Sequence, residues 1–218
     1  MSTQRALKEE PRWLKPFLAQ CNTKSYDKNV DFIRQGQAAE SLYYLIEGSV
    51  AALMFDEDER RELMLAYINK GEFIGEMGLF VPQNTRSVIV RTRTRCKVAE
   101  ITYQRLDRLL EEELADVAKE LLYSLGAQLS MRLQMTSRKV GHLAFLDVTG
   151  RIAGTLLDLC KQPDAMTHPD GMQIRVTRQE LGRIVGCSRE MAGRVIKSLE
   201  EQGLVSVKGK TIVVYGAR

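Results

Sequence analysis

The segment 176–205 constrains the fold most, because it predicts two short helices joined by a tight turn. Thr177-Arg178-Gln179-Glu180 has the pattern of a capping box, so a helix should begin there. Gly186-Cys187 should end that helix, and Ser188 can cap a second helix that ends at Gly203. Two short helices with a glycine in the turn between them are typical of a helix-turn-helix.

The second of these helices has two chemically different faces when about 100° is allowed for each residue. The apolar face consists of Met191, Ala192, Val195 and Leu199. The opposite face carries Arg189, Glu190, Arg194 and Lys197. Arginine can pair with guanine and glutamate can accept from cytosine, so this face suits the edges of base pairs in the major groove. The alternative is a solvated face with an ion pair between Glu190 and Arg194, four residues apart.

We favour DNA binding over that alternative, because the local charge and the following residues agree with it. Residues 1–147 carry equal numbers of basic and acidic residues, so the whole surplus of +4 lies in residues 148–218. Such a surplus is typical of a nucleic-acid partner. Residues 204–207 and 210–215 predict a hairpin wing with Lys208-Gly209 at its tip. We therefore expect double-stranded DNA as a partner, with Thr177, Gln179 and Ser188 at backbone phosphates and Arg178 among the contacts.

The N-terminal part of the chain has a different pattern. Residues 1–20 predict a short helical region around Arg12–Leu18, and residues 25–105 contain short apolar runs separated by glycines. Many short strands with regular turns predict a sandwich, roll or barrel. Residues 106–140 then switch to a spacing of threes and fours, which predicts one long amphipathic helix. That helix either packs on its own domain or forms a two-chain coiled coil, and the period alone favours neither.

A second candidate site combines Phe73-Ile74-Gly75-Glu76-Met77-Gly78 with Arg86-Ser87. Glycines let a ligand approach the backbone, and an arginine, a serine hydroxyl and backbone N–H groups suit a phosphate. A carboxylate such as that of Glu76 suits a ribose hydroxyl. The alternative is a glycine turn with a surface Glu–Arg ion pair.

Three longer strings resemble the cyclic AMP receptor family within the CRP/FNR superfamily: residues 143–151, 162–173 and 185–190. The resemblance covers nearly the whole chain. It implies an α+β protein with a cyclic-nucleotide-binding β-roll at 1–115, a dimerisation helix and hinge at 116–145, and a winged helix-turn-helix at 146–218. It also implies a homodimeric transcription regulator that contacts RNA polymerase. In that family, a ligand at the dimer seam sets the two recognition helices for successive major grooves, roughly 34 Å apart.

The same resemblance implies roles for individual residues. Glu76 would hold the ribose, and Arg86 and Ser87 would hold the cyclic phosphate beside Gly75. Arg132 matches a further residue near the phosphate, and Thr136-Ser137 matches the adenine-contacting pair. The implied polymerase-contacting residues are Thr167, His168 and Gly171. At a second polymerase surface the chain departs from the family, because Asn22, Thr23 and Lys24 stand where the family is richer in histidine.

The resemblance leaves two ligands open. Residues 188–194 and 91–94 are similar to a CAP-like (Clp) branch that responds to cyclic di-GMP, whose ligand inhibits DNA binding. In that branch an acidic residue replaces the phosphate-site serine, whereas Ser87 and Ser137 are intact here. A hydroxyl accepts a phosphate that a carboxylate would repel, so cyclic AMP is the favoured ligand and cyclic di-GMP the alternative.

Other function classes find little support. No apolar run reaches the roughly 18 residues of a membrane span, and no signal segment is apparent, so we expect a cytoplasmic protein without a membrane partner. Four scattered cysteines and two histidines, His142 and His168, predict reduced thiols and no metal site or other cofactor. No nucleophile or paired-carboxylate motif indicates an enzyme.

Overall fold

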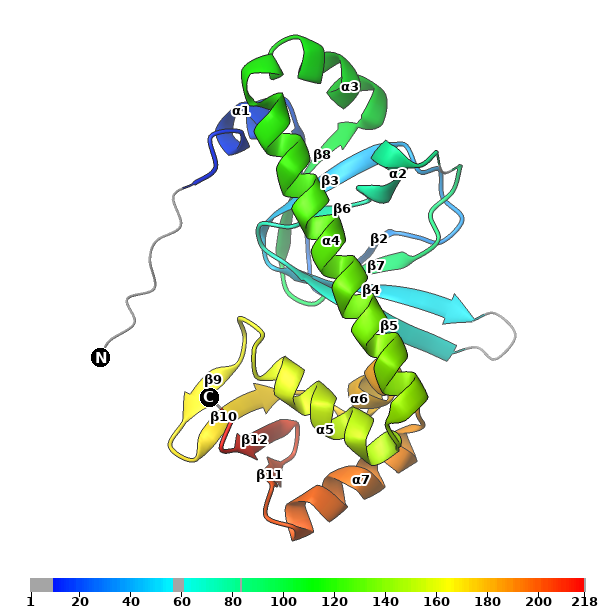
Figure 1. The fold of residues 1–218 in the computed structure, drawn as a ribbon, viewed down its shortest axis with the longest axis vertical. Coiled ribbons are helices and arrows are strands. Elements are labelled where there is room, and N and C mark those ends of the chain that lie inside the picture. Colours follow the sequence, from blue (N-terminus) through cyan, green and yellow to red (C-terminus); the bar gives the residue numbers. More distant parts are fainter. Residues whose placement is uncertain (1–9, 57–60, 83, 218) are drawn as a thin grey trace. The chain divides into compact units, whose positions relative to one another are not determined.

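The computed structural model describes residues 10–56, 61–82 and 84–217. The described residues of Met1–Ala51 and Tyr67–Leu133 form one compact unit, and those of Ala52–Ala66 and Gln134–Arg218 form a second. The mixed fold predicted from the sequence is confirmed: a β-roll, a long helix and a winged helix-turn-helix follow in chain order (Figure 1). The predicted domain limits near residues 115 and 146 stay predictions.

Two four-stranded sheets make up the β-roll. In the first sheet the order is β1 (Asn22–Tyr26), β8 (Cys96–Thr102), β3 (Ser41–Glu47) and β6 (Phe73–Ile74). In the second the order is β2 (Asp31–Ile33), β7 (Ile89–Thr92), β4 (Ser49–Asp56) and β5 (Arg61–Asn69). Within the first sheet, Tyr43 pairs with Glu100 on one side and Ile74 on the other.

An aromatic cluster joins this sheet to the helices around it. Trp13 precedes α1 (Leu14–Ala19) and stacks on Phe73, with ring centroids 5.4 Å apart. Tyr44 meets Phe73 edge to face at 5.0 Å. The Trp13 indole N–H donates to Ser124 Oγ at 3.0 Å, which ties this end of the chain to the long helix. The helix predicted around Arg12–Leu18 is therefore present, although residues 1–9 lie outside the described residues.

The prediction of one helix over residues 106–140 is wrong. The structure has α3 (Tyr103–Glu111) and α4 (Ala115–Phe145), separated by a turn in which Glu112 leaves helical geometry. Leu114 is buried, and its N–H donates to the Leu109 carbonyl at 2.8 Å. Both helices bury leucines in the same core, so the threes-and-fours spacing continues across the turn and conceals it.

The two halves of α4 differ in what covers their apolar side chains. Val117, Leu121 and Leu125 are buried in the β-roll core. Further along, Leu133 is 68% exposed and Phe145 is 87% exposed. The first half thus packs on its own domain, whereas nothing within the described residues covers the apolar side chains at the far end.

The second unit contains the predicted winged helix-turn-helix. It holds α5 (Val148–Leu159), α6 (Arg178–Val185) and α7 (Arg189–Glu201), with a sheet in the order β11 (Val205–Lys208), β12 (Thr211–Tyr215), β10 (Gly171–Arg175) and β9 (Met166–His168). The buried side chains of α5, α6, α7 and the sheet form one core. The wing predicted over residues 204–215 is confirmed as the β11–β12 hairpin.

The turn chemistry of Thr167-His168-Pro169-Asp170-Gly171 predicts a loop, and that prediction is wrong in part. His168 pairs directly with Gly171, so Thr167 and His168 belong to β9 and only Pro169-Asp170 form the turn. The turn residues were read correctly from the sequence. The strands flanking them are too short to show a period, and they form because β10 pairs with β12, which lies far along the chain.

Truncating Leu121 to alanine should destabilise the β-roll. Leu121 is fully buried, so Leu121→Ala leaves a cavity and should lower the free energy of unfolding by about 2–5 kcal/mol. Urea unfolding of Leu121→Ala and of Ser130→Ala, at an exposed position on the same helix, checks this. Equal stability of the two variants would contradict the packing described for α4.

Candidate functional site

Arg86 is a buried cation without a carboxylate partner among the described residues. Its side chain is 7% exposed. Nη2 donates to the Ser41 carbonyl at 2.5 Å, and Nη1 donates to the Tyr103 hydroxyl at 3.1 Å. The guanidinium also lies 5.7 Å from the Tyr43 ring centroid. Carbonyls, hydroxyls and ring faces hold the guanidinium in place and leave its charge uncompensated, which is costly for a buried ion and favours an anionic ligand.

The tyrosines around Arg86 do not neutralise it. Burial, joined by the Glu100 carboxylate, raises the pKa of Tyr43 to about 12. Tyr43 donates to Glu100 at 3.0 Å, as a neutral phenol does. The Tyr103 hydroxyl donates to the Gly75 carbonyl at 2.6 Å while it accepts from Arg86. Tyr103 thereby connects Arg86 to the glycine turn.

The glycines predicted in this turn are required by geometry. Gly75 has φ +84°, and a Cβ there would lie 2.5 Å from Arg86 Nη1. A Cβ on Gly78 would lie 2.5 Å from the Tyr103 hydroxyl. A larger residue at either place would push Arg86 or Tyr103 away, so the turn allows the close approach expected of a ligand site.

Glu76 is the second buried charge of the site, and Arg132 compensates it. Glu76 is 2% exposed, at the start of the short helix α2 (Met77–Phe80). Arg132 on α4 bonds Glu76 Oε1 at 2.5 Å through Nη1 and the Phe73 carbonyl at 2.8 Å through Nη2. The alternative of a surface Glu–Arg pair does not describe this arrangement, because the Glu76–Arg132 pair is largely buried and joins two distant segments.

Four of the seven predicted ligand residues therefore lie together: Gly75, Glu76, Arg86 and Arg132. Ser87 follows Arg86 directly and its side chain is exposed. Thr136 and Ser137 are exposed on α4 within the second compact unit. Three further residues of the site were not predicted from the sequence: Ser41, Tyr103 and Gln128. The Gln128 side-chain amide accepts from the Phe73 N–H and donates to the Phe73 carbonyl. No local pattern marks them, because each reaches the site only through the tertiary fold.

The predicted DNA-reading residues lie on the helix pair as expected. Thr177 caps α6 in a complete capping box with Glu180, and Ser188 caps α7 by accepting from the Met191 N–H at 3.1 Å. Gly186 takes the left-handed conformation, φ +76°, that the turn needs. The hydroxyl and N–H of Thr177 both already donate to Glu180.

The polar face of α7 is exposed and the apolar face is buried, as the helical spacing predicts. The exposed residues are Arg189, Glu190, Arg194 and Lys197. Neither Glu190 nor Arg194 makes an ion pair with another residue that the structure describes. The alternative of a Glu190–Arg194 pair is therefore absent from this conformation, and both side chains are available to a partner.

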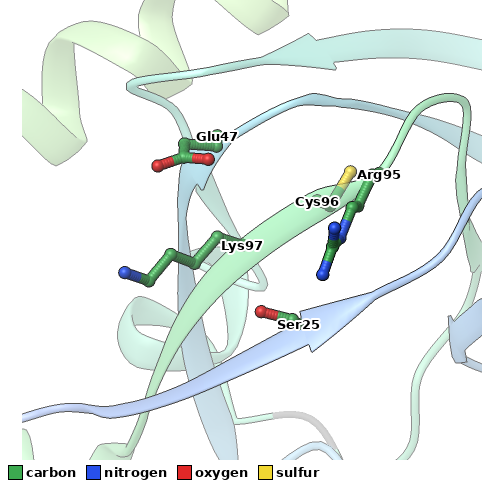
Figure 2. Close-up of a pocket in the computed structure, with 5 residues that line it drawn as sticks. All are labelled: Ser25, Glu47, Arg95, Cys96 and Lys97. Atoms are coloured by element: carbon green, nitrogen blue, oxygen red, sulfur yellow. The ribbon is translucent and has the colours of Figure 1, made fainter.

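A separate polar depression of about 220 Å³ lies on the β-roll (Figure 2). Figure 2 shows Arg95, Cys96 and Lys97, from β8 and the loop before it, with Ser25 on β1 to one side and Glu47 on β3 to the other. Burial raises the pKa of Cys96, so its thiol is protonated and a poor nucleophile. None of the predicted ligand residues lines this depression.

Metal binding and membrane insertion receive no support from the described part of the chain. Among those residues, no group of three or more His, Cys, Asp or Glu is placed to hold a metal ion. No helix there is both long and apolar enough to cross a membrane. The four cysteines are free thiols.

Comparison with known proteins assigns the N-terminal and C-terminal parts of the chain to two different domain families. Residues 23–113 match the cyclic nucleotide-binding domain, and residues 150–215 match the Crp-like helix-turn-helix domain. These two matches define the class: a DNA-binding transcription regulator that responds to a cyclic nucleotide, which acts as an allosteric ligand.

Full-length relatives then identify the family. The chain is 57% identical over 202 residues, 93% of each chain, to the cAMP-activated global transcriptional regulator CRP of Escherichia coli O6:H1. It is 55% identical, over 94% of each chain, to the cAMP-activated global transcriptional regulator Vfr of Pseudomonas aeruginosa. The solved structure of the c-di-GMP responsive global regulator CLP of Xanthomonas campestris matches with a TM-score of 0.88 and 53% identity, over 94% of this chain and 98% of that one. The chain belongs to the CRP/FNR family.

Removing the Tyr103 hydroxyl should lower the stability of the β-roll. Tyr103→Phe deprives Arg86 of an acceptor and the Gly75 carbonyl of a donor, so the free energy of unfolding should fall by about 1–3 kcal/mol. Urea unfolding measures this, with Tyr123→Phe at a 70% exposed position as the control. If both variants unfold alike, Tyr103 does not hold Arg86.

Proposed function

We propose that the chain binds cyclic AMP in the β-roll and that this ligand favours its binding to a palindromic DNA site. The observation that carries the proposal is the buried Arg86 guanidinium, which no carboxylate among the described residues neutralises. A cyclic phosphate supplies the missing charge and can accept several hydrogen bonds. The names of the CRP and Vfr relatives, both cAMP-activated, support this ligand.

Each predicted ligand residue has a role in this proposal. Arg86 and Ser87 bind the phosphate, and the turn at Gly75 lets it approach. Glu76 binds the ribose, with Arg132 compensating its charge before the ligand arrives. Thr136 and Ser137 bind the adenine, one of them from the partner subunit.

We also infer a homodimer built on α4. Its second half presents large apolar side chains that no described residue covers: Met131, Leu133, Met135, Val140 and Leu143. A helix of 31 residues with an uncovered apolar series is well suited to pairing with a second copy. Ligand at this seam would act through its higher affinity for the DNA-competent dimer, and the hinge between α4 and α5 would carry the change.

On DNA, the proposal assigns base contacts to Arg189, Glu190 and Arg194, with Lys197 beside them. The backbone contacts are assigned to Arg178, Gln179 and Ser188, and to Thr177, whose hydroxyl would exchange Glu180 for a phosphate. RNA polymerase would meet the β9–β10 hairpin at Thr167, His168 and Gly171. Such a regulator carries out no chemical conversion and works where the DNA is, in the cytoplasm.

Cyclic di-GMP is the second candidate ligand, favoured by one observation: the similarity to CLP, which is described as c-di-GMP responsive. The two candidates predict opposite responses, since cyclic AMP should tighten DNA binding and cyclic di-GMP should weaken it.

The first experiment titrates the protein with each nucleotide while its binding to a palindromic duplex is followed at fixed salt. Cyclic AMP should tighten DNA binding at least tenfold, a coupling of about 1.4 kcal/mol or more. Arg86→Leu should abolish the response and leave DNA binding without ligand unchanged. Weakening by cyclic di-GMP with no effect of cyclic AMP would replace the main proposal with the second.

A second experiment tests the recognition helix. Arg194→Ala should cost about 1–3 kcal/mol on the palindromic duplex and much less on a duplex of unrelated sequence, because a base contact carries specificity. Competition binding with the two duplexes measures the ratio. Equal losses on both would assign Arg194 to the phosphates instead of the bases.

A further inference from the structure

The β5 strand carries a short stretch, Glu62–Leu65, that contacts the helices of the DNA-binding unit. This stretch belongs to the same compact unit as residues 134–218. Glu62 Oε2 forms an ion pair with Arg183 Nη1 on α6 at 3.1 Å. The two side chains are 16% and 34% exposed, so the pair is only partly screened by water.

Two further contacts fix this stretch in place. Lys139 on α4 donates from Nζ to the Leu65 carbonyl. Leu63 reaches the turn between α6 and α7, since a Cβ built on Gly186 would lie 4.0 Å from Leu63 Cδ1. The strand is therefore held at Leu65 by α4 and presents Glu62 to α6.

Arg183 lies on the side of α6 that faces the proposed DNA. Gln179 and Arg183 are four residues apart on one helix, which places them on the same face. Gln179 is exposed and is one of the proposed phosphate contacts. The opposite face of α6 is buried through Leu181, Gly182 and Val185. Arg183 is therefore a cation on the side of α6 that faces the proposed DNA, and its guanidinium is already paired with the Glu62 carboxylate.

We propose that Glu62 competes with DNA phosphate for Arg183 and so restrains DNA binding. A carboxylate and a phosphate both bind a guanidinium through charge-assisted hydrogen bonds, so one excludes the other at the same nitrogen atoms. Glu62 also places a negative charge beside a surface that must approach the phosphate backbone. The inference rests on the proposed DNA-binding role of α6 and adds a regulatory contact to it.

The test compares Glu62→Gln, Arg183→Gln and the double variant with the unaltered protein. Binding to a duplex carrying an inverted repeat is measured at several salt concentrations, with saturating cyclic AMP throughout. Glu62→Gln keeps the shape of the side chain and frees Arg183, so binding should become about three- to tenfold tighter. The slope of log K against log salt should steepen by about 1, the change expected for one added phosphate contact.

Two comparisons separate competition from other effects. Glu112→Gln, at an exposed position in the turn before α4, removes the same charge elsewhere and should leave binding unchanged. In the double variant the gain should disappear, because no guanidinium remains to be released. Thermal unfolding of each variant checks that the fold is retained.

Three outcomes would overturn the inference. Glu62→Gln could bind no tighter than Glu112→Gln, or it could bind more weakly, which would make the pair a positioning contact. The double variant could also keep the full gain, which would show that Glu62 acts without Arg183. If the unaltered protein binds no duplex at any salt concentration, the proposed function fails, and this inference fails with it.

Discussion

The structure depends on the burial of the first half of α4 against the β-roll. Leu121 and Leu125 are fully buried there, together with Phe17, Phe73 and Leu106 from other elements. Burying one side chain of this size stabilises the folded state by roughly 1.5–3 kcal/mol before entropy is counted. Because this half of the helix is fixed, Gln128 and Arg132 further along reach Phe73 and Glu76. The core that holds the fold together thus also completes the proposed ligand site.

Within that site the two buried charges, Glu76 and Arg86, differ in whether a counter-ion lies beside them. Glu76 has Arg132, whereas the partners of Arg86 among the described residues are neutral acceptors and aromatic rings. A buried ion without a counter-ion costs free energy that the rest of the fold must offset. An anionic ligand that supplies the counter-charge then gains affinity, because the cost of placing the cation was met during folding. The same reasoning explains why a glycine stands at position 75, where a Cβ would displace the guanidinium.

In the DNA-binding unit, a basic side chain can be present and yet be unable to bind DNA phosphate, because another residue already pairs with it. The surplus of basic residues in 148–218 predicts attraction to DNA, and the exposed face of α7 agrees with it. Arg183 nevertheless bonds Glu62, which stands more than a hundred residues earlier in the sequence. The net charge of the sequence therefore sets the largest attraction to DNA that this unit can have. The ion pairs of the folded chain determine how many of its cations can bind phosphate.

Local patterns in the sequence were sufficient wherever the determining interactions are local. The capping box at Thr177, the glycine turn at Gly186 and the wing after Gly203 each depend on neighbours within a few residues, and all three were predicted correctly. Resemblance to a known family named Glu76, Arg86 and Arg132, which the structure brings together. The break at Glu112 and the pairing of β9 escaped prediction, because both depend on packing with distant segments. Tyr103, Ser41 and the Glu62–Arg183 pair have no local signal at all. The sequence by itself determined most of the elements and their order, and its resemblance to a known family indicated a cyclic nucleotide as ligand and DNA as partner. Only the tertiary structure decided which buried charge is left uncompensated and which surface arginine is already paired, because these depend on distances between residues far apart in the chain.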